Sequence, residues 1–195
     1  MIKFLMSGGL DSFVMAQIIH RKHPQLPWCH PSLGDRSAVF IDWAQPSVKQ
    51  ERISAKICAD YLGIPFSELK LNIDSKPMKI GADRPGPRVV PNRNRAFIEA
   101  VNCEKTRAVV IGCIKDDFND YLDCRPEYIK SLAEELKIMI WAPLINLTKP
   151  EIIKRAQTYD LPLHLTWSCY QSSTGAPCGN CNSCMQRELA FKLAR

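Results

Sequence analysis

The stretch FLMSGGLDSFV, residues 4–14, decides the fold of this protein. An apolar segment at residues 2–6 runs into Ser-Gly-Gly, and residues 10–21 follow with the spacing of a helix. Glycines let the backbone approach an anion closely, and the amides at a helix start point toward that anion. The stretch therefore predicts a phosphate-binding turn between a strand and a helix. A plain strand–helix turn capped by Asp11 is the simpler alternative.

The turn itself is the six-residue string SGGLDS. Its hydroxyl groups add hydrogen-bond donors, and Asp11 is placed to orient the loop or to help hold Mg²⁺. The string is not the GxxxxGK[ST] pattern, because both the lysine and the spacing are missing. The candidate nucleotide-binding residues of the turn are Ser7, Gly8, Gly9, Leu10, Asp11 and Ser12.

Strands and helices are predicted to alternate along the rest of the chain. Further strands are expected at 38–42, 68–73, 108–112 and 138–142, and helices at 47–62, 94–104, 127–136, 149–159 and 183–193. This order predicts an α/β fold with a parallel five-stranded sheet and helices on both faces. Segments 7–12, 42–45 and 112–123 follow strand ends and should converge on one crevice. Segments 23–37 and 76–91 are rich in proline and are predicted to be loops.

The predicted helix at 47–62 is amphipathic and should end at Gly63. The residues expected on its buried side are Val48, Ile53, Ile57, Cys58 and Tyr61.

Composition indicates an ordinary globular protein of 195 residues, with 46% hydrophobic and 24% charged residues. No window approaches the roughly 18 apolar residues of a membrane span, and no signal peptide is recognisable. We therefore expect a cytoplasmic protein with no membrane partner. The net charge of +6 permits an anionic partner, although a mildly basic surface is the simpler explanation.

Four of the nine cysteines lie close together near the end of the chain, in SCYQSSTGAPCGNCNSC, residues 168–184. The predicted ligands are Cys169, Cys178, Cys181 and Cys184. Four thiolates suit tetrahedral Zn²⁺, and a site filled by sulfur is structural rather than catalytic. Gly179 is expected to adopt the left-handed conformation of such a turn. An iron–sulfur cluster or redox disulfides are the alternatives.

Three further strings link the turn to the cysteine segment: VVPNRN at 89–94, DYLDCRPEYI at 120–129 and APLINLTKPEII at 142–153. The SGGLDS turn resembles the pyrophosphate-binding (PP) loop of the ATP pyrophosphatase superfamily. Together the strings resemble the 7-cyano-7-deazaguanine synthase family (QueC), over most of the chain. The resemblance implies a Rossmann-like fold of the adenine nucleotide alpha hydrolase type at 1–165, with a zinc-binding segment at 166–195 packed on it.

The resemblance also implies an activity, in which 7-carboxy-7-deazaguanine and ammonia are converted with ATP to 7-cyano-7-deazaguanine, AMP and pyrophosphate. The implied cofactors are ATP, Mg²⁺ and Zn²⁺, and a homodimer is possible in such a family. Adenine would rest near Phe40, Ile41 and Asp42, although the first two are equally explained as core.

Adenylation joins two anions, so positive charge must offset their repulsion. Arg93 and Lys149 are candidates for phosphate or carboxylate contacts, and with Asp11 they form the predicted catalytic set. The predicted substrate-binding residues are Asn94, Asp120, Tyr121, Asp123 and Arg125. Each isolated charge is equally explained by a surface or structural role, Arg125 as a support for its loop included. Cys124 is better explained as a small buried residue than as a catalyst.

The chain departs from the family pattern after the second strand, where Asp42-Trp43-Ala44-Gln45 stands in place of Asp-Tyr-Gly-Gln. The change to Ala44 is expected to affect local backbone geometry. Residues 63–89 form a shorter region than in the family, and 23–37 a longer one. Two alternatives follow: an enzyme that stops at the amide or passes the acid to a protein or nucleic-acid amine, and a non-catalytic nucleotide-binding module.

Overall fold

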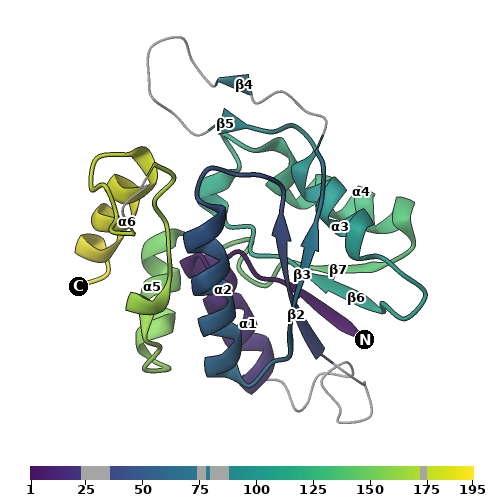
Figure 1. The fold of residues 1–195 in the computed structure, drawn as a ribbon, viewed down its shortest axis with the longest axis horizontal. Coiled ribbons are helices and arrows are strands. Elements are labelled where there is room, and N and C mark those ends of the chain that lie inside the picture. The colour runs from purple at the N-terminus through teal and green to yellow at the C-terminus, as the bar shows by residue number, and fades with distance from the viewer. Residues whose placement is uncertain (23–35, 74–77, 80–87, 172–174) are drawn as a thin grey trace.

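The computed structural model describes residues 1–22, 36–73, 78–79, 88–171 and 175–195 (Figure 1). The strands are β1 (Ile2–Leu5), β2 (Arg36–Asp42), β3 (Phe66–Lys70), β4 (Met78–Lys79), β5 (Arg88–Val89), β6 (Ala108–Val110) and β7 (Met139–Trp141). The helices are α1 (Leu10–Lys22), α2 (Val48–Leu62), α3 (Arg93–Val101), α4 (Pro126–Leu136), α5 (Lys149–Gln157) and α6 (Asn182–Leu193). Short 3₁₀ turns are η2 (Lys115–Asp117), η3 (Leu122–Cys124) and η4 (Leu163–Leu165).

Five strands form one parallel sheet in the order β3-β2-β1-β6-β7, which confirms the predicted α/β architecture. The order reverses at the central strand β1, because the chain builds outward from it first on one side and then on the other. Ligands of such sheets bind at this reversal, beyond the carboxyl ends of the strands. The SGGLDS turn lies at that point, directly after β1.

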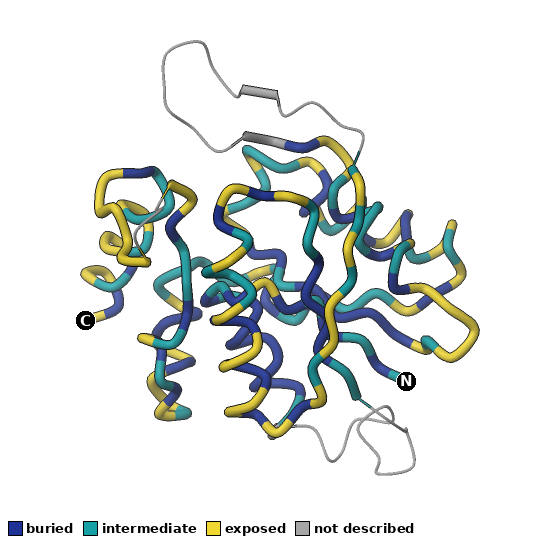
Figure 2. Tube along the Cα trace, viewed as in Figure 1, coloured by how far each residue is buried: buried dark blue, intermediate teal, exposed yellow. Residues whose placement is uncertain are grey.

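Buried residues run along the strands in the middle of the molecule (Figure 2). Alternate residues of the central strands face two separate cores. Phe4, Phe40 and Val110 pack with residues of α1, α2, α5 and α6. Val39 and Val109 face the other way, toward α3 and α4. A sheet buried on both faces needs apolar residues at every position, and this explains the continuous apolar runs of its inner strands.

Helix α2 ends at Gly63 as predicted, and this residue has φ +66°, but the buried side predicted for the helix was wrong at three of its five residues. Cys58 is buried and Val48 packs against the core, whereas Ile53, Ile57 and Tyr61 are 51%, 41% and 43% exposed. The small residues of the helix face inward instead, since α2 packs closely against the SGGLDS turn. Those buried residues are Ser54, Ala55, Cys58, Ala59 and Leu62.

Other boundaries differ by a few residues. Strand β3 begins at Phe66 rather than 68, because the edge strand pairs with β2 from Ala38↔Phe66 to Asp42↔Lys70 and carries polar residues on its outer side. Helix α3 ends at Val101, and Asn102 caps it. Strands β4 and β5 pair within predicted loop 76–91, most of which, like nearly all of loop 23–37, lies outside the described residues. Among the helices described, none is long and apolar enough to cross a membrane.

Candidate active site

A cavity of about 960 Å³ opens at the carboxyl ends of β1, β2 and β6. The residues after all three strands line it, so the predicted convergence of segments 7–12, 42–45 and 112–123 is confirmed. Small-molecule pockets commonly range from about 300 to 1,000 Å³, so this cavity lies at the upper end of that range.

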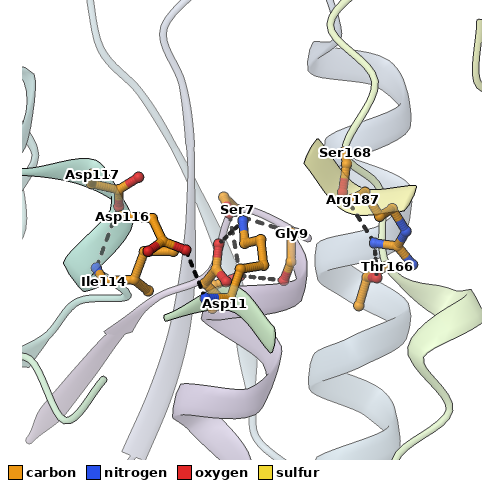
Figure 3. Close-up of polar contacts among 11 residues, drawn as sticks. Ser7, Gly9, Asp11, Ile114, Asp116, Asp117, Thr166, Ser168 and Arg187 are labelled. Atoms are coloured by element: carbon orange, nitrogen blue, oxygen red, sulfur yellow. Dashed lines mark hydrogen bonds and ion pairs between the residues drawn. The ribbon is translucent and has the colours of Figure 1, made fainter. Parts of the chain in front are cut away.

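The SGGLDS turn closes on itself through its two hydroxyl groups (Figure 3). The Ser12 hydroxyl donates to the Gly9 carbonyl at 3.0 Å and lies 3.2 Å from the Ser7 oxygen, which also accepts the Gly9 amide. The first helical bond of α1 runs from Phe13 N to the Gly9 carbonyl. The amides of residues 10–12 therefore precede the hydrogen-bonded ladder at the positive end of the helix, where an anion is favoured.

The two glycines of the turn differ in their surroundings. Gly9 lines the cavity, whereas Gly8 has φ +78° and faces α2. A Cβ on Gly8 would collide with the carbonyl oxygen of Glu51 and lie 2.7 Å from Ala55 N. Gly8 therefore permits close packing of α2 behind the turn.

Lys149, at the start of α5, forms an ion pair with Asp11 at 2.8 Å across 138 residues of sequence. Burial by itself lowers the pKa of the lysine, but the charge and hydrogen bond of Asp11 outweigh this, so the pKa is raised and the ammonium stays charged. Asp116 accepts the Lys149 amide at 2.8 Å, and a Thr148–Glu151 capping box begins the helix. The other Asp11 oxygen, Oδ1, is buried without a hydrogen-bond partner in the described part of the chain.

Asp117 lines the same cavity and was not singled out from the sequence. Burial and the negative charge of Asp11 raise its pKa from 3.8 to about 6, partly offset by Lys149 and Arg93. Its Oδ2 accepts the Ile114 amide at 3.3 Å. The only feature of the sequence that could have indicated Asp117 as a site residue is its position in the 112–123 segment, which follows a buried strand.

Arg93 is the first residue of α3, and its side chain enters the cavity among aromatic rings. Its guanidinium carbon lies 5.8–5.9 Å from the ring centroids of Trp43, Phe97 and Tyr121. The sequence singled out Arg93 and Tyr121, but it did not indicate Trp43 or Phe97 as their neighbours.

The predicted substrate-binding residues divide into two groups. Asn94, Asp120 and Tyr121 line the cavity, whereas Asp123 and Arg125 lie outside it. Asp123 is buried and accepts the backbone amide of Asn94 at 3.0 Å, so it caps helix α3. Arg125 donates to the Phe118 carbonyl at 2.9 Å and supports its own loop. Cys124 is buried beside Asn94, whose amide donates to its sulfur at 3.3 Å.

On the predicted adenine side, Phe40 and Ile41 line the cavity, but Asp42 does not. Asp42 binds Arg52 at 2.6 Å and accepts the Ala44 amide at 3.0 Å. Ala44 has φ +62°, a left-handed conformation that favours glycine. The substitution noted in the sequence therefore leaves an alanine in a strained backbone position.

The four clustered cysteines bring their sulfur atoms within 4.8 Å of one another. Gly179 adopts φ +75°, as predicted for the turn between them. Four sulfur donors at this separation fit one tetrahedral zinc ion. Arg187 donates to Thr166 and Ser168 (Figure 3) and to the Leu163 carbonyl. The adjoining Trp167 amide donates to the Gly8 carbonyl at 2.8 Å. The cysteine segment is thereby joined to the SGGLDS turn.

The sheet order, the turn after β1 and the Lys149–Asp11 pair together define a nucleotide-binding α/β protein of the PP-loop class. The family model described as "Queuosine biosynthesis protein QueC" matches residues 2–195. The chain belongs to the QueC family.

Relatives named 7-cyano-7-deazaguanine synthase support this assignment. The Campylobacter curvus protein is 31% identical, with 97% of this chain and 92% of the relative covered. The Nautilia profundicola protein is 32% identical with the same coverage. The predicted subunit of a tRNA methyltransferase from Methanocaldococcus jannaschii shares the fold alone, with a TM-score of 0.54 and 20% identity over 80% of this chain and 75% of that chain. The named relatives do not favour a diverted acceptor or a non-catalytic module.

Proposed function

We propose that this protein uses ATP to convert 7-carboxy-7-deazaguanine and ammonia into 7-cyano-7-deazaguanine. The observation that carries the proposal is the cavity at the carboxyl ends of the strands, where the SGGLDS turn, Lys149 and Asp11 meet beside Arg93 and Tyr121. A family member with this arrangement has the groups needed to adenylate an acid.

The reaction requires two adenylations. A carboxylate oxygen attacks the α-phosphorus of ATP, the bond to pyrophosphate breaks, and an acyl-adenylate forms. Ammonia attacks the acyl carbon, loses a proton and expels AMP, which leaves the amide. The amide oxygen then attacks a second ATP with loss of pyrophosphate, and departure of AMP with the two nitrogen protons gives the nitrile.

The residues of the turn are assigned to the phosphates. We assign the amides at the start of α1 and the hydroxyls of Ser7 and Ser12, which line the cavity, to the developing charge on pyrophosphate. Lys149 stays protonated beside Asp11 and supplies a positive charge there. Phe40 and Ile41 offer an apolar surface to adenine. Asp120, which lines the same cavity, is assigned to accept hydrogen bonds from the guanine-like edge.

Two metal ions complete the proposal. The buried, unpartnered Asp11 Oδ1 is the protein atom best placed for Mg²⁺, which would neutralise phosphate charge. Zn²⁺ would be held by Cys169, Cys178, Cys181 and Cys184 as a closed structural site, joined to the turn through Trp167.

A homodimer in the cytoplasm is proposed as the working form. Helix α6 carries Met185, Leu189 and Leu193 at four-residue spacing, all more than half exposed, and α2 carries a similar exposed row. Contiguous exposed apolar side chains commonly mark protein contacts. Sedimentation of the purified protein measures its subunit number directly.

The test of the activity is mass spectrometry of the products formed from 7-carboxy-7-deazaguanine, Mg-ATP and ammonium. We expect the nitrile with two AMP and two pyrophosphate per molecule. AMP with amide alone would contradict nitrile synthesis, and no acid-dependent ATP consumption would contradict the enzyme assignment. Lys149→Ala should lower kcat/KM by about 100-fold or more, as loss of a charge aimed at a transition state commonly does.

A further inference from the structure

Arg93 differs from Arg52 and Arg95 in its partners. Arg52 pairs with Asp42 and Glu68, and Arg95, two residues along α3, pairs with Glu99 and Glu135. Within the described residues, no carboxylate or other oxygen accepts a hydrogen bond from the Arg93 side chain, and its Nε is buried without a partner. A buried guanidinium nitrogen without an acceptor is costly unless a ligand supplies one.

Three rings hold this charge without neutralising it. Trp43 comes from the segment after β2, Phe97 from α3 and Tyr121 from the segment before η3, and each ring centroid lies within 5.9 Å of the guanidinium carbon. All three residues and Arg93 line the cavity. Aromatic faces attract a cation but cannot accept its N–H groups in the plane of the guanidinium. That fork of donors remains available to a planar, bidentate acceptor.

The cavity also contains a different cationic group, Lys149, paired with Asp11 beside the phosphate-binding turn. Lysine acts as a compact point charge suited to phosphates, whereas arginine in a flat apolar frame suits a carboxylate joined to an aromatic ring. The two cations therefore have settings suited to two different anions.

We propose that Arg93 binds the carboxylate of the acid substrate, and that Trp43, Phe97 and Tyr121 form a frame that selects planar aromatic acids. This inference rests on the proposed function. Arg93 holds the carboxylate by its charge while one carboxylate oxygen is presented to the α-phosphorus of ATP. The amide formed in the first half of the reaction is neutral, so it no longer depends on the charge of Arg93.

This difference separates a carboxylate contact from a phosphate contact. Both halves of the reaction use ATP, but only the first uses a charged acceptor. We expect Arg93→Gln to lower kcat/KM about 10- to 100-fold with 7-carboxy-7-deazaguanine as substrate, the range for losing a charge-assisted bidentate pair. With the amide supplied as substrate, the decrease should stay below about 5-fold, and the Kd of ATP should be unchanged.

Arg95→Gln is the matched control, because it removes the same charge from the same helix at a site outside the cavity. It should leave both reactions unchanged. Trp43→Ala should weaken use of the acid, and Trp43→Tyr should restore it, since tyrosine keeps a ring face beside the guanidinium. An equal decrease for acid and amide in Arg93→Gln, or a weaker Kd for ATP, would overturn the inference. Failure of the unmodified protein to use either substrate would instead overturn the proposed function.

Discussion

Ionisation of Asp117 should lower the free energy of unfolding of the ligand-free protein as the pH rises. Asp117→Asn should remove this loss of stability. Burial and the nearby charge of Asp11 raise the pKa of the carboxyl to about 6, from 3.8. Near pH 3 the group is protonated in both the folded and unfolded chains and has no effect. Between about pH 4 and 6 the unfolded chain releases the proton first, so unfolding becomes more favourable with rising pH. Above pH 6 both states are ionised and the full cost remains.

The size of the effect follows from the pKa change. At about 1.4 kcal/mol per pKa unit, the change corresponds to an upper value of about 3 kcal/mol. The carboxylate lines an open cavity, and water reduces the interaction of partly accessible charges, so we expect a gain of about 1–2 kcal/mol for Asp117→Asn at pH 7. The asparagine carbonyl can still accept the Ile114 amide, so the hydrogen bond at 3.3 Å is kept.

The assay is urea unfolding of both proteins between pH 4 and 8 with zinc in excess. At pH 4 the free energy of unfolding of Asp117→Asn should be only slightly higher than that of the unmodified protein. This difference should grow with rising pH until about pH 6.5. Asp120→Asn, which removes a charge from the same loop, corrects for the change in net charge. A stability difference that does not vary with pH, or a less stable Asp117→Asn at pH 7, would refute this explanation.

Three further predictions concern the turn, the strained alanine and the metal. Gly8→Ala should lower the free energy of unfolding by at least about 2 kcal/mol in urea titration, because the new Cβ meets the backbone of α2. Gly63→Ala, also at positive φ but with open space around it, should cost only about 1 kcal/mol, and equal costs would contradict the packing role of Gly8. Ala44→Gly should raise thermal stability by up to about 1 kcal/mol, since it relieves a left-handed alanine, and a lower Tm would argue against strain. The unmodified protein should bind about one zinc per chain, measured by elemental analysis. Cys181→Ser should abolish both this zinc binding and ATP turnover. Cys103→Ser, which lies outside the cluster, should retain both. Stoichiometric iron in the unmodified protein would contradict a zinc site.

The parallel sheet, the strand–turn–helix geometry of SGGLDS and the cysteine cluster could all be predicted from the sequence, because each depends on residues that are close together in the chain. Apolar runs between helical segments indicate buried parallel strands, and SGGLDS follows the first of them directly. The spacing of Cys178, Cys181 and Cys184 places three thiols in one short segment before any folding is considered.

Tertiary structure decided which charges meet and which surfaces remain open. Lys149 reaches Asp11 across 138 residues, and Arg93 is surrounded by rings from three separate segments. Asp123, predicted from its string to contact the substrate, lies outside the cavity and accepts the Asn94 amide in a helix that begins 30 residues earlier. Periodicity alone predicted burial of Ile53, Ile57 and Tyr61, which are exposed, because the close approach of Gly8 requires small residues on the buried side of α2. Such contacts depend on distances between elements, which the local pattern of a sequence does not contain.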